Sequence, residues 1–121
     1  MKSVKLVAII DDEPDILLTV SSILKRHGYD VITGSNARDI DEIIEQTPDL
    51  LLVDMNMPGK QGSELCRELK SAEITKNIRI VLTSGNPQLE LAFKECGADS
   101  YLQKPFGKRE LLKLISELIA A

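Results

Sequence analysis

The chain has 121 residues, of which 43% are hydrophobic and 28% are charged, a balance typical of one globular domain with one core. Its net charge of −4 argues against a nucleic-acid partner, because such a surface would need a basic patch. No apolar stretch approaches the roughly 20 residues that span a bilayer, so we expect no membrane partner either.

The N-terminal segment and the two cysteines indicate a cytoplasmic protein. The apolar run after Lys5 ends in acids and lacks a small-residue cleavage site, so we interpret it as a strand rather than a signal peptide. Cys66 and Cys96 are too few and too far apart in the sequence for a disulfide framework or a zinc site. We expect both to be reduced, partly buried thiols.

Short apolar runs alternate with segments whose apolar residues recur at helical spacing. In chain order we expect a strand at 4–10, a helix at 14–28, a strand at 29–34, a helix at 37–47, a strand at 49–54, a helix at 63–72, a strand at 78–84, a helix at 87–97, a strand at 100–103 and a helix at 108–121. Strands joined by helical crossovers run parallel, and nearly continuous apolar strands are typical of sheets buried on both faces. The pattern therefore predicts a three-layer α/β sandwich.

Polar side chains stand at the ends of these strands, where open parallel sheets bind their ligands. Two aspartates and a glutamate follow the first strand, an aspartate ends the third, two hydroxyls end the fourth, and a lysine follows the fifth. In chain order they are Asp11, Asp12, Glu13, Asp54, Thr83, Ser84 and Lys104. Because the carboxyl ends of parallel strands meet at one edge, we expect these groups to converge.

The chemistry of this set points to phosphoryl transfer. Crowded carboxylates raise one another's pKa values unless a cation intervenes, and Mg²⁺ prefers such oxygen ligands together with waters and phosphate. Lys104 and a nearby hydroxyl suit the remaining oxygens of a phosphoryl group. Asp54, at the end of a buried strand, is placed to attack phosphorus and to carry an aspartyl phosphate.

Each residue alone also has a simpler interpretation. Asp11 and Asp12 could favour the start of the helix at 14–28, where acids interact well with the helix dipole. Asp54 could be an ordinary turn residue before Pro58 and Gly59, and Lys104 a solvated charge at a strand end. None of these interpretations explains the other groups of the set.

Four motifs together resemble the receiver domains of two-component response regulators, the CheY-like proteins. They are "IIDDEP" (9–14), "DMNMPGKQG" (54–62), "VLTSG" (81–85) and "GADSYLQKPF" (97–106). The resemblance covers the whole chain and implies a single receiver domain over residues 1–121. It implies a flavodoxin-like (βα)5 sandwich whose parallel five-stranded sheet has the order 2-1-3-4-5.

The resemblance also implies a role for each site residue. Asp54 would accept a phosphoryl group from a phosphohistidine of a sensor histidine kinase or a histidine phosphotransfer protein. Asp12 and Asp54 would bind Mg²⁺ through their carboxylates, Asn56 through its backbone carbonyl and Asp11 through a water. Lys104 would pair with the phosphoryl oxygens.

Further implied features concern the response to phosphorylation. The hydroxyl drawn toward the phosphoryl group would be that of Ser84, or of Thr83 if the register differs by one residue. Tyr101 would be the rotating switch aromatic, and the Lys104–Pro105 bond would be cis. A downstream protein target, and possible homodimerisation, would use the helix at 87–97, the strand at 100–103 and the helix at 108–121. In the last helix Leu114 falls outside the inward stripe, a weak indication of a partner surface.

Other functions stay open beside this phosphorylation-dependent switch, which would catalyse only its own phosphorylation and dephosphorylation and is otherwise not an enzyme. An unphosphorylated receiver could act as a scaffold. A phosphatase of the haloacid-dehalogenase type would also use an aspartate nucleophile with Mg²⁺, but it would have an acid at the position of Asn56. A flavodoxin-like cofactor binder would need a phosphate-cradling loop after the first strand, where this chain has acids.

Overall fold

The computed structural model describes residues 4–57 and 60–119, and in these segments five strands alternate with five α-helices. The strands are β1 (Leu6–Ile10), β2 (Asp30–Gly34), β3 (Leu50–Asp54), β4 (Arg79–Ser84) and β5 (Ser100–Gln103). The α-helices are α1 (Pro14–Arg26), α2 (Ile40–Glu45), α3 (Gly62–Ser71), α4 (Leu89–Cys96) and α5 (Lys108–Leu118). None of the helices in these segments is long and apolar enough to cross a membrane.

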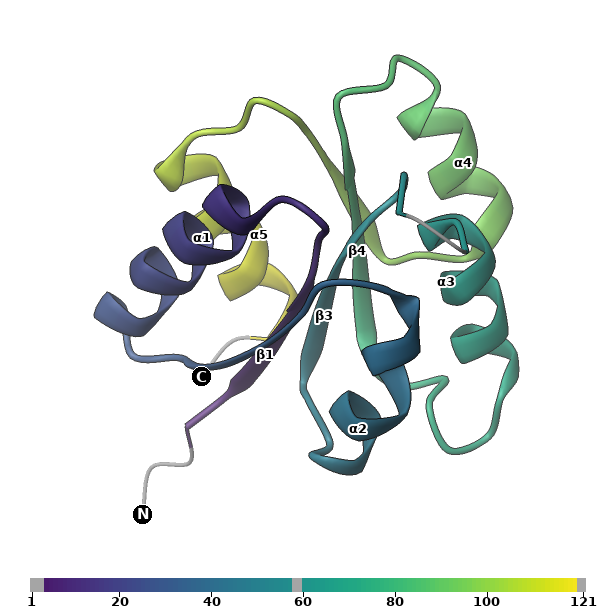
Figure 1. Cartoon of the computed structure of the whole chain (residues 1–121), viewed down its shortest axis with the longest axis horizontal. Coiled ribbons are helices and arrows are strands. Elements are labelled where there is room, and N and C mark those ends of the chain that lie inside the picture. The colour runs from purple at the N-terminus through teal and green to yellow at the C-terminus, as the bar shows by residue number, and fades with distance from the viewer. Residues whose placement is uncertain (1–3, 58–59, 120–121) are drawn as a thin grey trace.

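The strands form one parallel sheet in the order β2-β1-β3-β4-β5, which confirms the expected flavodoxin-like topology. Helices α1 and α5 cover one face of the sheet, and α2, α3 and α4 cover the other (Figure 1). The register pairs Ile10 with Val53 and Asp54 with Thr83, so the carboxyl ends of β1, β3 and β4 reach the same edge.

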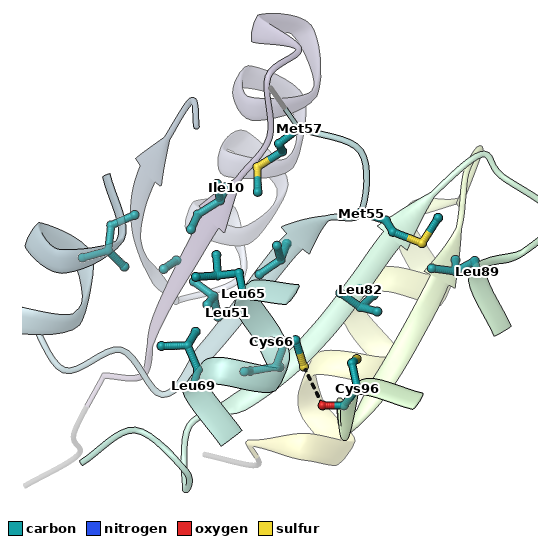
Figure 2. Packing of buried hydrophobic residues seen from close by; sticks show 14 residues of the cluster. Ile10, Leu51, Met55, Met57, Leu65, Cys66, Leu69, Leu82, Leu89 and Cys96 are labelled. Carbon is teal, nitrogen blue, oxygen red and sulfur yellow. Dashed lines mark hydrogen bonds between the residues drawn. The ribbon is translucent and has the colours of Figure 1, made fainter. Parts of the chain in front are cut away.

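The core consists of two hydrophobic clusters, one on each face of the sheet. All five residues of β3 are buried, and they alternate between the clusters, with Leu51 and Val53 on one face and Leu50 and Leu52 on the other. Figure 2 shows the cluster that contains Leu51. Burial of one such side chain contributes roughly 1.5–3 kcal/mol, so β3 is a firmly held base for the residue at its end.

The segment expected as one helix at 37–47 is divided. A short 3-10 helix, η1 (Ala37–Asp39), precedes α2 and begins at a capping box: the Asn36 side chain accepts from the Arg38 backbone N–H at 2.8 Å. The Asp39 side chain in turn accepts from the backbone N–H of Asn36. The helix ends early because Thr47 adopts a left-handed conformation, with φ of 50°, just before Pro48.

The expectation for Leu114 was wrong. Leu114 is half-buried and packs against the cluster beneath α1 and α5 instead of lying outside the inward stripe. It stands three residues after Leu111 and four before Leu118, and side chains at these spacings share one face of a helix. Leu114 therefore belongs to the core-facing side of α5.

The two cysteines are more buried than expected and are neighbours in space. Cys66 on α3 is 0% exposed and Cys96 on α4 is 3% exposed, and both are free thiols. The Cys66 thiol donates to the Cys96 carbonyl oxygen at 3.6 Å (Figure 2). Burial raises the pKa of the Cys66 thiol, so it is held protonated as a packing group between the two helices.

Candidate functional site

Three aspartates meet at the carboxyl edge of the sheet. Asp11 follows β1 and Asp54 ends β3, and both are buried, whereas Asp12 is exposed. One carboxylate oxygen from each of the three lies within 4.8 Å of the others. Such a group of hard oxygen donors is the kind of set that binds a divalent cation.

The backbone around Asp54 is held by the close approach of α3 to the end of β3. The Gly62 backbone N–H donates to the Met55 carbonyl at 2.9 Å, and the Met55 N–H donates to the Thr83 carbonyl at 2.8 Å. A Cβ atom on residue 62 would collide with the Asp54 carbonyl oxygen and lie 2.9 Å from Val53 Cγ1. The glycine that closes the "DMNMPGKQG" motif is therefore required by packing against the strand that carries Asp54.

Asp11 connects the end of β1 to the start of α1 and to Lys104. Its Oδ1 accepts from the backbone N–H of Glu13, the residue that precedes α1, at 2.9 Å. Its Oδ2 accepts from the Lys104 ammonium, also at 2.9 Å. The same ammonium lies 3.8 Å from Asp54 Oδ2 and 3.8 Å from Glu13 Oε1, so Lys104 forms ion pairs with all three acids.

Lys104 follows β5, and its peptide bond to Pro105 is cis, as the resemblance implies. Its backbone N–H donates to the Ser84 carbonyl at 2.8 Å, which joins the ends of β4 and β5. Burial alone would lower the pKa of the lysine, but the hydrogen bond to Asp11 and the negative charges of Asp11, Asp54 and Glu13 outweigh it and raise the pKa. The ammonium is therefore charged throughout the neutral range.

The Asp54 carboxyl is poorly stabilised as an anion without a metal. Its pKa is raised from 3.8 to about 6, chiefly by burial and next by the negative charge of Asp11. The positive charge of Lys104 and a hydrogen bond from the Asn56 backbone N–H, at 3.3 Å, oppose the rise without cancelling it. Added positive charge at this edge would favour the ionised form.

The two candidate hydroxyls differ in their surroundings. The Ser84 side chain accepts from the Asn56 side-chain amide at 3.0 Å and from the Asn86 backbone N–H at 2.9 Å. Thr83 pairs with Asp54 in the sheet, and among the described residues its hydroxyl makes no such contact with the loop after β3. The assignment of the switch hydroxyl to Ser84 stays a prediction, and this geometry favours it.

Tyr101 lies on β5, half-buried against the face covered by α4. Its ring packs on that of Phe93 from α4, with 5.0 Å between the ring centroids and an angle of 46° between the planes. This geometry places the aromatic ring where a change in α4 would reach it, and rotation of the ring stays a prediction.

Sequence reasoning missed two side-chain amides. Asn56 was expected to act only through its backbone carbonyl, and Gln103 had no expected role. The Gln103 amide donates to the carbonyls of Ser84 and Asn86, at 3.1 and 3.3 Å. Neither role leaves a signal in the sequence, because each side-chain amide meets its partner only in the folded chain. Pro58 and Gly59, which could form a turn after Asp54, lie outside the described residues.

An apolar hollow of about 500 Å³ lies beside the acidic site. It is bounded by α1 on one side and by residues 104–108 with Leu111 on the other. Its lining includes Ile16, Ile23 and Phe106, and Lys104 stands where it meets the acidic residues.

Residues 7–116 match the family model of the response regulator receiver domain, and the chain belongs to this family. It is thus a signalling domain of the two-component type. The phosphate regulon transcriptional regulatory protein PhoB of Pseudomonas aeruginosa is 34% identical over 118 residues, which are 95% of this chain and 52% of PhoB. The chain therefore spans about half the length of that curated relative.

Solved receiver structures agree with this family assignment. Chemotaxis protein CheY4 of Vibrio cholerae superposes with a TM-score of 0.87 at 27% identity, covering 97% of this chain and 100% of that one. The receiver domain of DrrB, in a structure described as BeF3-activated, superposes with a TM-score of 0.83 at 28% identity, covering 96% of this chain and 97% of that one.

Proposed function

We propose that the protein is a phosphorylation-dependent signalling switch in which Asp54 accepts a phosphoryl group from a phosphohistidine. The observation that carries the proposal is the buried Asp54 carboxylate beside Asp11, Asp12 and the Lys104 ammonium. In the transfer an Asp54 oxygen forms a bond to phosphorus while the bond from phosphorus to the donor nitrogen breaks. The electron pair of that bond stays on the departing imidazole.

The residues present fit a bound Mg²⁺. Asp12 and Asp54 would hold it through their carboxylates, Asn56 through its backbone carbonyl and Asp11 through a water. The three carboxylates are hard oxygen donors within 4.8 Å of one another, as such an ion requires. When bound, the ion would supply the positive charge that the buried Asp54 carboxylate lacks.

The other residues would stabilise the transferred phosphoryl group and couple its presence to a conformational change. Lys104, which lies 3.8 Å from Asp54, would neutralise a phosphoryl oxygen, and the Ser84 hydroxyl would donate to another. Movement of Ser84 would bias the loop that leads into α4 and, through Tyr101, the surface formed by α4, β5 and α5. A downstream protein, or a second copy of the chain, would bind this surface.

The phosphate donor would be a sensor histidine kinase or a histidine phosphotransfer protein. Its histidine must reach Asp54 from outside the sheet edge, and the apolar hollow between α1 and residues 104–108 flanks that approach. An exposed apolar surface bordered by charged residues suits a protein partner better than a small ionic substrate. This feature favours a protein donor over the phosphatase alternative.

The experiment that tests this proposal is intact-mass spectrometry after incubation with acetyl phosphate, with and without Mg²⁺. We expect one added phosphoryl group in the wild type, dependent on Mg²⁺ and absent in Asp54→Ala. Asp41→Asn, at an exposed acid of α2, is the matched control and should be phosphorylated normally. Absence of the adduct from folded wild-type protein would favour the scaffold, and sustained hydrolysis of phosphate esters would favour the phosphatase.

A further inference from the structure

The Ser84 hydroxyl has both of its acceptor positions filled. It is buried in a residue that is 1% exposed, and it accepts from the Asn56 amide at 3.0 Å and the Asn86 backbone N–H at 2.9 Å. A hydroxyl has two lone pairs and one proton. The proton is therefore the one group that Ser84 can still offer, and the two donors hold its oxygen in place.

Asn56 touches both ends of the proposed switch. Its backbone N–H donates to Asp54 Oδ1 at 3.3 Å, and its side-chain amide donates to Ser84. Its neighbours Met55 and Met57 are buried, 6% and 7% exposed, and Figure 2 shows both side chains as members of the hydrophobic cluster. The backbone of Asn56 is thus anchored on both sides, and its side chain, although exposed, places the amide within hydrogen-bond distance of the Ser84 oxygen.

The hydrogen bonds continue from Ser84 toward α4. The Asn86 side-chain oxygen accepts from the Gln88 N–H at 2.8 Å, one residue before α4 begins. The Asn86 carbonyl accepts from the Gln103 amide at 3.3 Å. The hydroxyl of Ser84 is therefore the point where the loop carrying Asn56 is tied to the loop that leads into α4.

We propose that Asn56 is a positioning residue that retains Ser84 in the unphosphorylated arrangement and so opposes activation. The proposal rests on the function proposed above, in which Ser84 donates to a phosphoryl group on Asp54. Ser84 must turn its oxygen toward Asp54 to do so, and that movement breaks its bond to the Asn56 amide. Loss of the amide would release Ser84 and make capture of the phosphoryl group easier.

Beryllofluoride, a mimic of the phosphoryl group, measures this effect without turnover. We expect Asn56→Ala to lower the apparent dissociation constant for beryllofluoride about three- to tenfold at saturating Mg²⁺, measured by fluorine NMR, the change expected for one intramolecular hydrogen bond. The substitution keeps the backbone carbonyl expected to bind the metal. Gln61→Ala, at an exposed amide lining the same polar groove as Asn56, is the matched control and should leave the constant unchanged.

A double-mutant cycle separates positioning of Ser84 from a general effect on the site. If Asn56 acts through the hydroxyl, the effect of Asn56→Ala disappears in a Ser84→Ala background. An effect of the same size in both backgrounds, no effect at all, or weaker binding by Asn56→Ala would overturn the proposal. A second readout is the side-chain amide resonance of Asn56, which should shift on beryllofluoride binding and in Ser84→Ala alike.

The two proposals fail in distinguishable ways. If the wild type neither binds beryllofluoride nor takes a phosphoryl group from acetyl phosphate, the switch function fails, and the role of Asn56 falls with it. If the wild type does both but the cycle shows no coupling between Asn56 and Ser84, only the role of Asn56 fails.

Discussion

The Lys104 ammonium lies 2.9 Å from Asp11 and 3.8 Å from Asp54, so its hydrogen bond goes to the acid that is not the proposed phosphoacceptor. Asp11 is almost wholly buried, with a side chain that is 2% exposed, and Lys104 is the cation that compensates it. Asp54 interacts with the same ammonium at the longer distance and is therefore stabilised less by its positive charge. The negative charge of the proposed phosphoacceptor is therefore only partly neutralised, and an additional cation would stabilise it.

Replacement of Lys104 should therefore destabilise the metal-free protein. We expect Lys104→Met to lower the free energy of unfolding by about 2–4 kcal/mol at pH 8 in EDTA, because it leaves buried carboxylates without a partner. Urea denaturation followed by circular dichroism measures the change. Lys108→Met, at an exposed lysine four residues on, is the control and should change stability little. Equal stability of the two variants would contradict the buried ion pair.

The raised pKa of Asp54 predicts a pH-dependent gain from its neutralisation. The pKa of Asp54 is about 6 in the folded chain, whereas its ordinary value is 3.8. Protonation of Asp54 therefore stabilises the fold fully below pH 3.8, and this contribution is lost as the pH rises through 6. Asp54→Asn should therefore stabilise the metal-free protein by about 3 kcal/mol at pH 8, because each pKa unit corresponds to about 1.4 kcal/mol. The gain should shrink toward zero near pH 4.

Urea denaturation tests this pH dependence. The free energies of unfolding of wild type and Asp54→Asn are compared in EDTA at intervals from pH 4 to pH 8. Asp41→Asn provides the comparison for an exposed aspartate, and its stability difference from wild type should stay small across the range. A difference between Asp54→Asn and wild type that does not vary with pH would show that the asparagine acts by packing rather than by removing an unfavourable charge.

The layers of the fold and the location of the site were predictable because their causes are local. The run that became β3 is apolar at four successive positions, which is typical of a strand buried on both faces, and the charge of Asp54 marks its end. Helical crossovers then make the strands parallel, and parallel strands bring their carboxyl ends together. The convergence of Asp11, Asp54 and Lys104 follows from those two steps.

Other features depend on contacts between distant segments and left no local pattern. The Asn56 amide meets Ser84, 28 residues away, and Cys66 meets Cys96, 30 residues away. The prediction for Leu114 was wrong because the core-facing side of α5 is wider than the apolar stripe predicted from the sequence. The 3-10 turn before α2 arises from Asn36 and Asp39, whose side chains bond to the backbone and compete with a regular helix.

Binding of Mg²⁺ should stabilise the folded chain. For a dissociation constant on the order of 1 mM, 10 mM Mg²⁺ raises the free energy of unfolding by about 1.4 kcal/mol, because the ion binds only the folded site. We expect this increment in the wild type and in Asp41→Asn, and its loss in Asp12→Asn, whose exposed side chain leaves the core intact. Denaturation with Mg²⁺ or with EDTA measures it, and an equal increment in Asp12→Asn would place the ion elsewhere.

Gly62 should be intolerant of any side chain, because its backbone is pressed against the end of β3. A Cβ there would collide with the Asp54 carbonyl oxygen and crowd Val53. We expect Gly62→Ala to lower the free energy of unfolding by about 1–3 kcal/mol. The better helix propensity of alanine, worth up to about 1 kcal/mol, offsets part of this loss.

Gly85→Ala is the matched control, because a Cβ at residue 85 meets nothing within 4 Å. It should be neutral in urea denaturation. The collision at residue 62 would displace the backbone of Asp54, the proposed phosphoacceptor. Gly62→Ala should therefore also lose part of the Mg²⁺-dependent increase in the free energy of unfolding. A defect confined to α3 would lower stability but leave that increase intact. A Gly62→Ala variant as stable as the wild type would mean that α3 can move away from β3 without loss.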